Sequence, residues 1–415
     1  MNIPVDRING IIDKLLKGIM LELKTEKDYA FVGDSVVNVV RSRVNAELCS
    51  ALVNLHNHKV ANYKSLIEKL TKWLIMNQNS NGSWNEKHVN IDAPSIVFTS
   101  TCALSLLDVK EDFPDIAIPD NVFENAANFL IKQEISNGHF RKSEYYHADI
   151  LNADAMVAAF LVRLGVKYQN DEYLKAGKRA ISNVCAQQFT DGSYPYGGPT
   201  RAYPYKYHLY VPCIHYQTIT LHYLLKSLPF IKSDFLEHSI DVGIKWLLAN
   251  QYDNGTFNWR NSGLNFALYL TATYALTIPL YKRYMNKDER AEKMISKSLD
   301  VFEKQIFDGV LLRWEKGESK SFIKGMFDAL GGGFIGEYPF SYKILRSLHR
   351  IHREIARSKV SKNMTVSKLT NRSVGYYSAF LSSVESSTNY PDLYMTTQAL
   401  EALSSVLTNG VTDSK

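Results

Sequence analysis

The chain has 415 residues, of which 45% are hydrophobic, so it can bury the core of one large or two ordinary domains and is not a disordered protein. Its net charge of +6 is spread along the chain, and no Lys/Arg block with interleaved aromatic residues indicates a nucleic-acid partner. No signal peptide and no apolar run of about 20 residues is present. We therefore expect a cytoplasmic protein without a membrane span, with a weak preference for anionic partners.

Apolar residues recur at helical spacing from the beginning of the chain, for example Ile8, Ile12, Leu15 and Ile19. Strand-like alternation of useful length is absent, and Gly and Pro cluster between the helical stretches. The spacing predicts helices over 7–22, 35–56, 62–79, 92–108, 121–134, 145–165, 171–188, 208–228, 234–251, 262–285, 288–306, 338–358 and 391–408.

A glutamine followed by an Asn-Gly or Asp-Gly pair recurs after several of these helices. The glycines are Gly82, Gly138, Gly192, Gly255 and Gly309, which are 56, 54, 63 and 54 residues apart. Glycine adopts the positive φ that a sharp turn or a helix end requires. The turns follow Gln78, Gln133, Gln188, Gln251 and Gln305, and an aromatic residue comes next in most of them. Such even spacing indicates an array of repeated helical pairs.

Six helical pairs can form a straight solenoid or close into a ring. The second helix of each pair is richer in small and apolar residues, as in Ala153, Ala155, Ala158 and Ala159, so we expect it to be the more buried one. The long aromatic and polar segments after the glycine turns favour the ring. The predicted fold is therefore an all-α, closed (α/α)6 toroid, a single domain over 1–415 in which 359–415 is the closing segment.

The repeats resemble the Gln-Trp repeats of terpenoid cyclases, whose toroid is shared with protein prenyltransferases. Trp73, Gln78, Gly82 and Trp84 match that motif best, together with Trp246, Gln251, Gly255 and Phe257. The resemblance covers about 60–410. Similar turns occur in α/α-toroid polysaccharide lyases and uronyl epimerases, so it implies the architecture and leaves the chemistry open.

The motifs that the resemblance implies for cyclases are missing from the chain. It contains neither Asp-x-Asp-Asp, the acid of a protonating cyclase, nor Asp-Asp-x-x-Asp, which binds magnesium in an ionising synthase. Cys213 and His215 are the only close Cys/His pair, with no second cysteine near a complementary histidine. We expect neither a metal nor a cofactor.

Polar and aromatic residues gather at the entries to the second helices, and in a ring these entries converge on one mouth of a central cavity. The candidates for acid/base catalysis are Tyr146, His147, His208 and Tyr210. The candidates for substrate binding are Asp92, Asp149, Asn152, Asp154, His215, Tyr216, Trp259, Arg260 and Tyr377. Each has a structural alternative: Asp92 is also suited to capping a helix, and Asp149 and Asn152 to linking helices.

These residue types suit removal of the C5 proton of a uronic acid, in a lyase or an epimerase. That reaction needs a Tyr or His base and donors such as Asn152 and Arg260 that neutralise the carboxylate. The expected partner is an acidic oligosaccharide, or another small to medium substrate, in the central cavity. A glycoside hydrolase would need two facing carboxylates. A terpenoid cyclase or prenyl-binding enzyme, with a dry aromatic cavity, and a non-catalytic ring that binds a glycan or peptide remain alternatives. The segment 307–337 is either a lid or a linker.

Overall fold

The computed structural model describes residues 3–33, 39–88, 91–143, 146–198, 210–258, 270–307, 311–312 and 393–408. Within these ranges, residues 88, 91, 146–148, 270, 307, 311 and 312 are described in their backbone only. The predicted helix 338–358 and nearly all of the predicted lid or linker lie outside the described residues.

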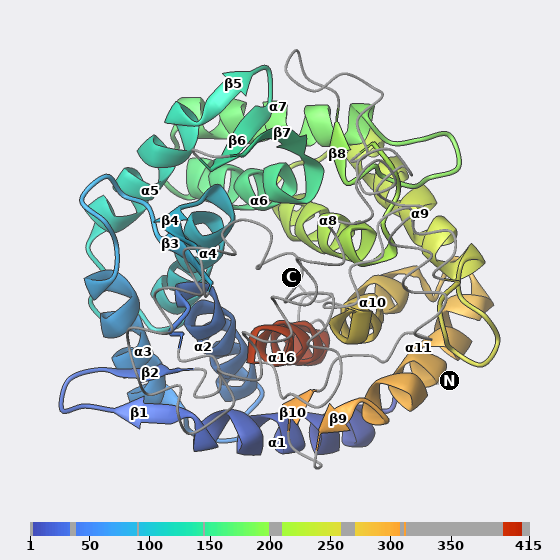
Figure 1. The fold of residues 1–415 in the computed structure, drawn as a ribbon, viewed down its shortest axis with the longest axis horizontal. Coiled ribbons are helices and arrows are strands. Elements are labelled where there is room, and N and C mark those ends of the chain that lie inside the picture. The colour runs from blue at the N-terminus through green and yellow to red at the C-terminus, as the bar shows by residue number, and fades with distance from the viewer. Residues whose placement is uncertain are drawn as a thin grey trace, which may run out of the picture.

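The described helices form two concentric layers around one axis (Figure 1). The outer helices are α1 (Val5–Leu21), α3 (Lys64–Met76), α5 (Asp120–Lys132), α7 (Asp171–Ala186), α9 (Asp234–Ala249) and α11 (Glu289–Glu303). The inner helices are α2 (Ser42–Asn57), α4 (Ile96–Asp112), α6 (Leu151–Lys167), α8 (Ile214–Ser227), α10 (Leu270–Tyr284) and α16 (Leu393–Thr408). The short 3-10 helix η1 (Leu228–Phe230) follows α8.

The inner layer closes on itself. Each inner helix contacts the next one along the chain, and α16 contacts both α10 and α2. The predicted α/α toroid is therefore confirmed. The inner helix between α10 and α2 is α16, which corresponds to the predicted helix 391–408.

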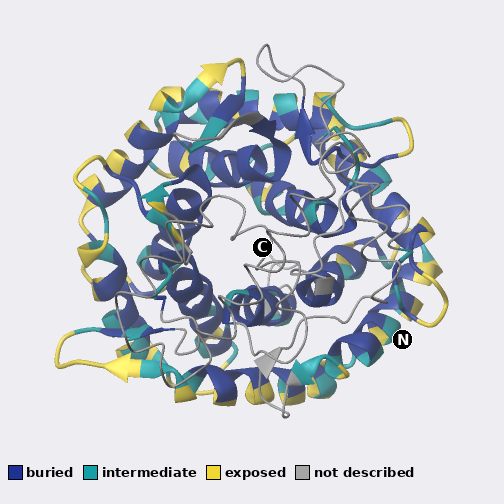
Figure 2. Ribbon diagram, in the orientation of Figure 1, coloured by how far each residue is buried: buried dark blue, intermediate teal, exposed yellow. Residues whose placement is uncertain are grey.

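Burial follows the two layers. Helix α1 buries Ile8, Ile12, Leu15 and other apolar residues along one stripe, as expected for a helix with one solvent face. The inner helices are buried almost all round, and the exposed residues lie on the outside of the ring (Figure 2). The core is thus the space between the layers, while the remaining face of each inner helix points to the axis.

Short strands join the layers at the end of the ring where the inner helices begin, which we call the entry end. They include the hairpin β3 (Asn85–His88) and β4 (Ile91–Pro94) and a four-stranded antiparallel sheet of β5 (Glu134–Ser136), β6 (His139–Ser143), β7 (Tyr146–Ile150) and β8 (Gly197–Gly198). Two further hairpins are β1 (Leu23–Thr25) with β2 (Ala30–Val32), and β9 (Ile306–Phe307) with β10 (Leu311–Leu312). The predicted helices 92–108 and 145–165 consequently begin late, at Ile96 and Leu151, because β4 and β7 occupy their first residues.

The glycine turns tie neighbouring outer helices together. Gly82, Gly138, Gly192 and Gly255 have φ between +83° and +93°. A Cβ on Gly192 would lie 2.3 Å from the Val242 carbonyl oxygen of α9, so only glycine fits this turn. The Gln188 amide donates to the carbonyls of Gly192 and Ser239, and thereby links α7 to α9.

One of the glutamine turns differs from the prediction. In the second turn Glu134 takes the place expected for Gln133, and its Oε1 accepts the Gly138 N–H at 2.9 Å. Gln133 accepts from Arg141 instead. The register of that repeat is therefore one residue later than the sequence suggested. The weaker fifth turn ends at Gly309, which lies outside the described residues.

A second repeated contact fixes the rotation of the inner helices. The fourth residue of four inner helices accepts a backbone N–H from the segment that precedes the helix. These brace residues are Asn45, Thr99, Asp154 and Gln217, which accept from Val32, Trp84, Phe140 and Tyr194 at 2.7, 3.0, 3.1 and 2.7 Å. Each brace residue therefore points away from the axis, toward the outer layer.

Candidate functional site

The brace residues identify the side chains that face the axis. In α2, α4, α6 and α8 the second residue lies two positions before the brace residue, about 200° around the helix, and so on the opposite face. The second residues of α10 and α16 hold the same position in their helices, and that of α16, Tyr394, contacts Arg43 of α2. We call these residues the entry layer: Arg43, Val97, Asn152, His215, Thr271 and Tyr394. Five of the six carry polar groups, so the axis at the entry end is lined mainly by hydrogen-bonding side chains.

Arg43 is the cation of the entry layer, and its side chain is 5% exposed. Its Nε lies 2.7 Å from Glu47 Oε1, one turn further along α2. Its Nη1 donates to the Tyr394 hydroxyl at 2.7 Å, and the guanidinium carbon lies 4.8 Å from the centre of that ring. Burial by itself would lower the pKa of Arg43, but Tyr394 and Glu47 outweigh it and hold the pKa well above its usual range. Arg43 is therefore charged at every relevant pH.

His215 lies on α8, on the opposite side of the ring from α2 (Figure 1). It is 1% exposed, and its Nδ1 lies 2.9 Å from Thr273 Oγ1. Burial, and then the charge of Arg43, lower the pKa of His215 to about 3. The imidazole is therefore neutral at pH 7, which is the form that can accept a proton.

Tyr216 and Asn152, which were predicted to bind substrate, also lie at the entry end. The ring of Tyr216 is half-buried and lies 4.4 Å from that of Tyr196. Asn152 is buried, and its Oδ1 has no hydrogen-bond partner among the described residues. A buried amide oxygen without a partner costs about 1–3 kcal/mol, so a ligand that supplies a donor would be favoured there.

Asp149 and Asp154 lie between the two helix layers. Asp149 accepts from Gln187 of α7 at 2.7 Å, and Asn183 of α7 donates to both carboxylates. Burial, and then the charge of Asp149, raise the pKa of Asp154 well above its usual range. Asp154 is a brace residue, so its position is explained by the contact between layers rather than by a ligand on the axis.

The other predicted residues are placed as follows. Asp92, on β4, is 52% exposed and pairs with Lys87 at 3.2 Å. Tyr210 packs edge-on against Phe189, in the turn that ends at Gly192, with 5.1 Å between ring centres. For Tyr146 and His147 the structure describes only the backbone of β7. The remaining candidates, His208, Trp259, Arg260 and Tyr377, lie outside the described residues.

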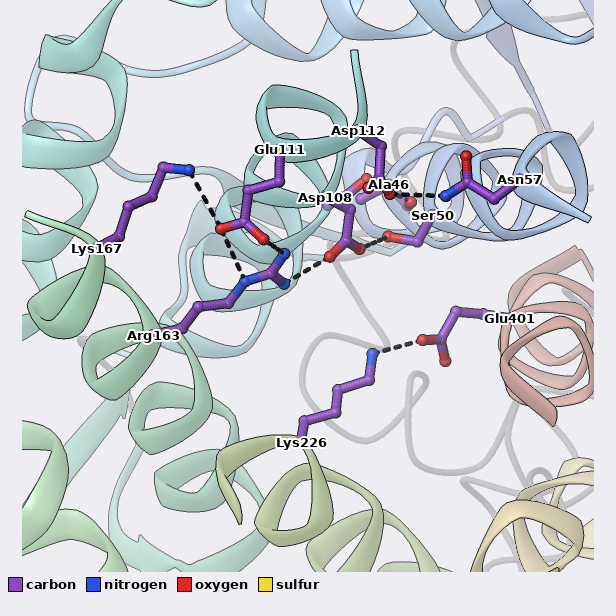
Figure 3. A network of polar contacts seen from close by, with 11 residues as sticks. Ala46, Ser50, Asn57, Asp108, Glu111, Asp112, Arg163, Lys167, Lys226 and Glu401 are labelled. Carbon is purple, nitrogen blue, oxygen red and sulfur yellow. Dashed lines mark hydrogen bonds and ion pairs between the residues drawn. The ribbon is translucent and has the colours of Figure 1, made fainter. Parts of the chain in front are cut away.

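A charged network that sequence reasoning missed lies at the opposite end of the inner helices, which we call the far end (Figure 3). Arg163 of α6 bridges Asp108 and Glu111 of α4 at 2.5 and 2.6 Å. Lys226 of α8 lies 2.5 Å from Glu401 of α16. Helices α8 and α16 are not neighbours in the ring, because α10 lies between them, so this ion pair spans part of the ring interior.

Glu401 has a second partner on α8. His222 Nε2 lies 3.2 Å from Glu401 Oε2. Burial by itself would raise the pKa of Glu401, but Lys226 and His222 outweigh it and hold the pKa well below its usual range. The axis is thus lined by ionisable side chains at the far end and by mostly polar ones at the entry end.

Membrane and metal features are absent from the described part of the chain. None of its helices combines the length and hydropathy that a bilayer span requires. Nor do three or more of its His, Cys, Asp and Glu side chains come together in a way that could bind a metal ion.

No protein-family model and no curated protein matches the chain. Solved structures do. Cellobiose 2-epimerase from Bacillus thermoamylovorans is similar over 76% of this chain and 91% of its own, with 9% identity and a TM-score of 0.60. A possible GH105-family protein from Salmonella enterica is similar over 99% of this chain and 96% of its own, with 11% identity and a TM-score of 0.61. An unsaturated glucuronyl hydrolase specific for heparin is similar over 79% of this chain and 95% of its own, with 12% identity and a TM-score of 0.53. At such identities the likeness establishes the α/α-toroid fold.

Proposed function

We propose that the chain is an enzyme that acts on a carbohydrate bound near the axis at the entry end of the ring. The observation that carries this proposal is the entry layer, in which Arg43, Asn152 and His215 are buried and polar. A sugar offers donors and acceptors to such groups, whereas a hydrocarbon would leave them desolvated without partners. The entry layer therefore favours a carbohydrate over an isoprenoid. Two of the similar structures, the cellobiose 2-epimerase and the unsaturated glucuronyl hydrolase, are enzymes of carbohydrates, which supports the same substrate class.

The reaction that we propose is removal of the C5 proton from a uronate residue. A base takes this proton, and the electron pair is delocalised into the carboxylate. In a lyase the pair then forms the C4–C5 double bond, while the C4 oxygen leaves with a proton from an acid. In an epimerase a proton returns to C5 from the other face. Both outcomes need an acid and a base but no redox partner.

His215 is the best described base, because it is neutral and lies in the entry layer. Its low pKa would make it a weak base in the empty ring. A substrate carboxylate near Arg43 would offset the positive charge and raise the pKa of His215 when substrate is present. Tyr146, His147, His208 and Tyr210 remain candidates for the acid and the second base, and Asn152, Tyr216 and Arg260 for substrate binding.

Incubation with a panel of uronate polymers and oligosaccharides tests the reaction. We expect either an absorbing unsaturated product or deuterium uptake at C5 in heavy water. His215→Gln should lower the rate by about a hundredfold or more, while His238→Gln, on the exposed face of α9, should not change it. Release of reducing ends without unsaturation would instead indicate a hydrolase. No product and no exchange with any uronate would refute the C5 chemistry.

A further inference from the structure

Arg43 has one hydrogen-bonding edge that nothing in the described part of the chain uses. Its Nε faces Glu47, its Nη1 donates to Tyr394, and its guanidinium carbon lies over the Tyr394 ring. Its Nη2 is buried and finds no hydrogen-bond acceptor among the residues that the structure describes. Guanidinium groups are rarely buried with a donor left unpaired, since the unmet donor loses its hydration without compensation. The geometry therefore provides a fixed, charged donor for an acceptor that a ligand can supply.

That acceptor belongs on the axis. Arg43 lies two residues before the brace residue Asn45, which turns its side chain toward the middle of the ring. Two of the buried acceptors that lack partners within the described ranges belong to inner helices: Asn152 Oδ1 in the entry layer, and Oε1 of Gln398, one turn after Tyr394 on α16. One charged donor and two neutral acceptors complement a ligand that carries one anionic group and several hydroxyl groups.

We propose that Arg43 binds the carboxylate of an acidic sugar through Nη2. This inference rests on the proposed function and assigns to Arg43 the role of specificity-determining residue. The planar guanidinium matches a carboxylate oxygen in geometry and in charge, and its other contacts with Glu47 and Tyr394 hold it in place before the ligand arrives. A preformed donor of this kind loses little conformational freedom on binding.

Glu47 provides a second test of the assignment, because its carboxylate already offsets the Arg43 charge. Burial raises the pKa of Glu47, and Arg43 opposes that effect. The other charged or titratable groups near this pair include Tyr394 and Glu401 of α16, Tyr223 and His215 of α8, and Cys102 of α4. A second carboxylate next to Arg43 would be repelled by Glu47. Removal of the Glu47 charge should therefore strengthen binding, whereas removal of the Arg43 charge should weaken it.

The test is calorimetric titration with disaccharides of glucuronate, galacturonate, mannuronate and guluronate. Each is compared with its carboxyl-reduced counterpart, which differs only in having a primary alcohol. We expect at least one uronate to bind the wild-type protein at least about tenfold more tightly than its reduced form. Arg43→Gln should weaken binding of that uronate about ten- to a hundredfold and leave the reduced form within about twofold. Glu47→Gln should tighten binding of the uronate.

Two further variants keep the test decisive. If Arg43→Gln fails to fold because Glu47 is left unpaired, the double variant Arg43→Gln/Glu47→Gln removes both charges, and it should bind the uronate and its reduced form equally. Arg179→Gln, which removes a charge from the outer helix α7, is the control and should bind like the wild type. Equal binding of uronates and reduced sugars by the wild type, no binding of any uronate, or tight uronate binding in the double variant would overturn the assignment.

The same variants separate this assignment from the proposed function. Uronate binding that depends on Arg43 but leads to no product or C5 exchange would keep the carboxylate site and refute the reaction. Turnover of a uronate that is unchanged in Arg43→Gln would keep the reaction and refute the site.

Discussion

Lys226 Nζ lies 2.5 Å from Glu401 Oε1 and joins two inner helices, α8 and α16, that are not adjacent in the ring. The side chain of Glu401 is 9% exposed and that of Lys226 is 30% exposed. The two partners are thus unequally able to reach water. Loss of Lys226 would leave a buried carboxylate with His222 as its remaining described partner, whereas loss of the Glu401 charge would leave an ammonium that can still be hydrated.

We therefore expect Lys226→Met to lower the free energy of unfolding by about 3 kcal/mol, and Glu401→Gln to lower it by about 1 kcal/mol. Urea titration of the single variants and of the double variant measures both effects and their coupling. The exposed pair of Lys287 and Asp241 is the control, and Lys287→Met should cost less than about 1 kcal/mol. Equal losses in the two single variants would show that unequal exposure is not what matters.

His215 should make stability depend on pH. Because its folded-state pKa, about 3, lies below that of an unfolded chain, protonation is disfavoured by folding. The resulting stability is present above about pH 6.5 and is lost as the pH falls toward 3. Between about pH 6.5 and 5 the loss from this group should be about 2 kcal/mol. Urea titrations at the two pH values should show this difference in the wild type and a smaller one in His215→Gln; identical differences would contradict it.

Asp154 should have the opposite dependence. Its folded-state pKa is raised, so the carboxyl favours folding while protonated, and that contribution is lost as the pH rises above about 4 toward the folded-state value. Asp154→Asn keeps an oxygen to accept the Phe140 N–H and adds a donor toward Asp149. It loses the oxygen that accepts from Asn183, but the Asn183 amide still has Asp149 as an acceptor. At about pH 7 we expect this variant to be at least as stable as the wild type in thermal unfolding. A loss of more than about 2 kcal/mol would show that the ionised carboxylate is required.

The turn glycines should be intolerant of any side chain. Gly192→Ala would place a Cβ 2.3 Å from the Val242 carbonyl oxygen at a φ of +93°, and should cost at least about 2–3 kcal/mol. Gly10 of α1 is the matched control, since a Cβ added there would have no described atom within 4 Å beyond its own helix backbone and chain neighbours. Gly10→Ala should stabilise the protein by about 0.5–1 kcal/mol, because alanine favours the helix. Thermal unfolding compares the two; similar effects would contradict the packing argument.

The helical repeats of the ring could be predicted from the sequence because the patterns that mark them are local. A positive φ at Gly82 or Gly255 and a stripe of Ile and Leu in α1 each act over a few residues. The short strands were missed for the same reason, since β4 and β7 are held by cross-strand pairing rather than by their own pattern. Their residues resemble the first turns of the helices that follow.

Arg43 could not be found in this way. Helix α2 is buried on nearly all sides, so its hydrophobic pattern does not reveal which residues face the axis. The brace contact of Asn45 with Val32 fixes its rotation, and that contact is long-range. The same contact in Asp154 explains why a carboxylate that looked functional in the sequence lies between the layers instead. Tyr394 was missed because its contact with Arg43 joins residues 351 positions apart.

The place of α16 between α2 and α10 also sets an order for assembly. Two partners of the Arg43 and Glu47 pair, Tyr394 and Thr397, are supplied 351 and 350 residues later in the chain. During synthesis the earlier inner helices can stack as an open arc, but the side of α2 that contacts α16 stays uncovered until α16 docks. Closure of the circle and completion of the arginine's surroundings are therefore the same late event.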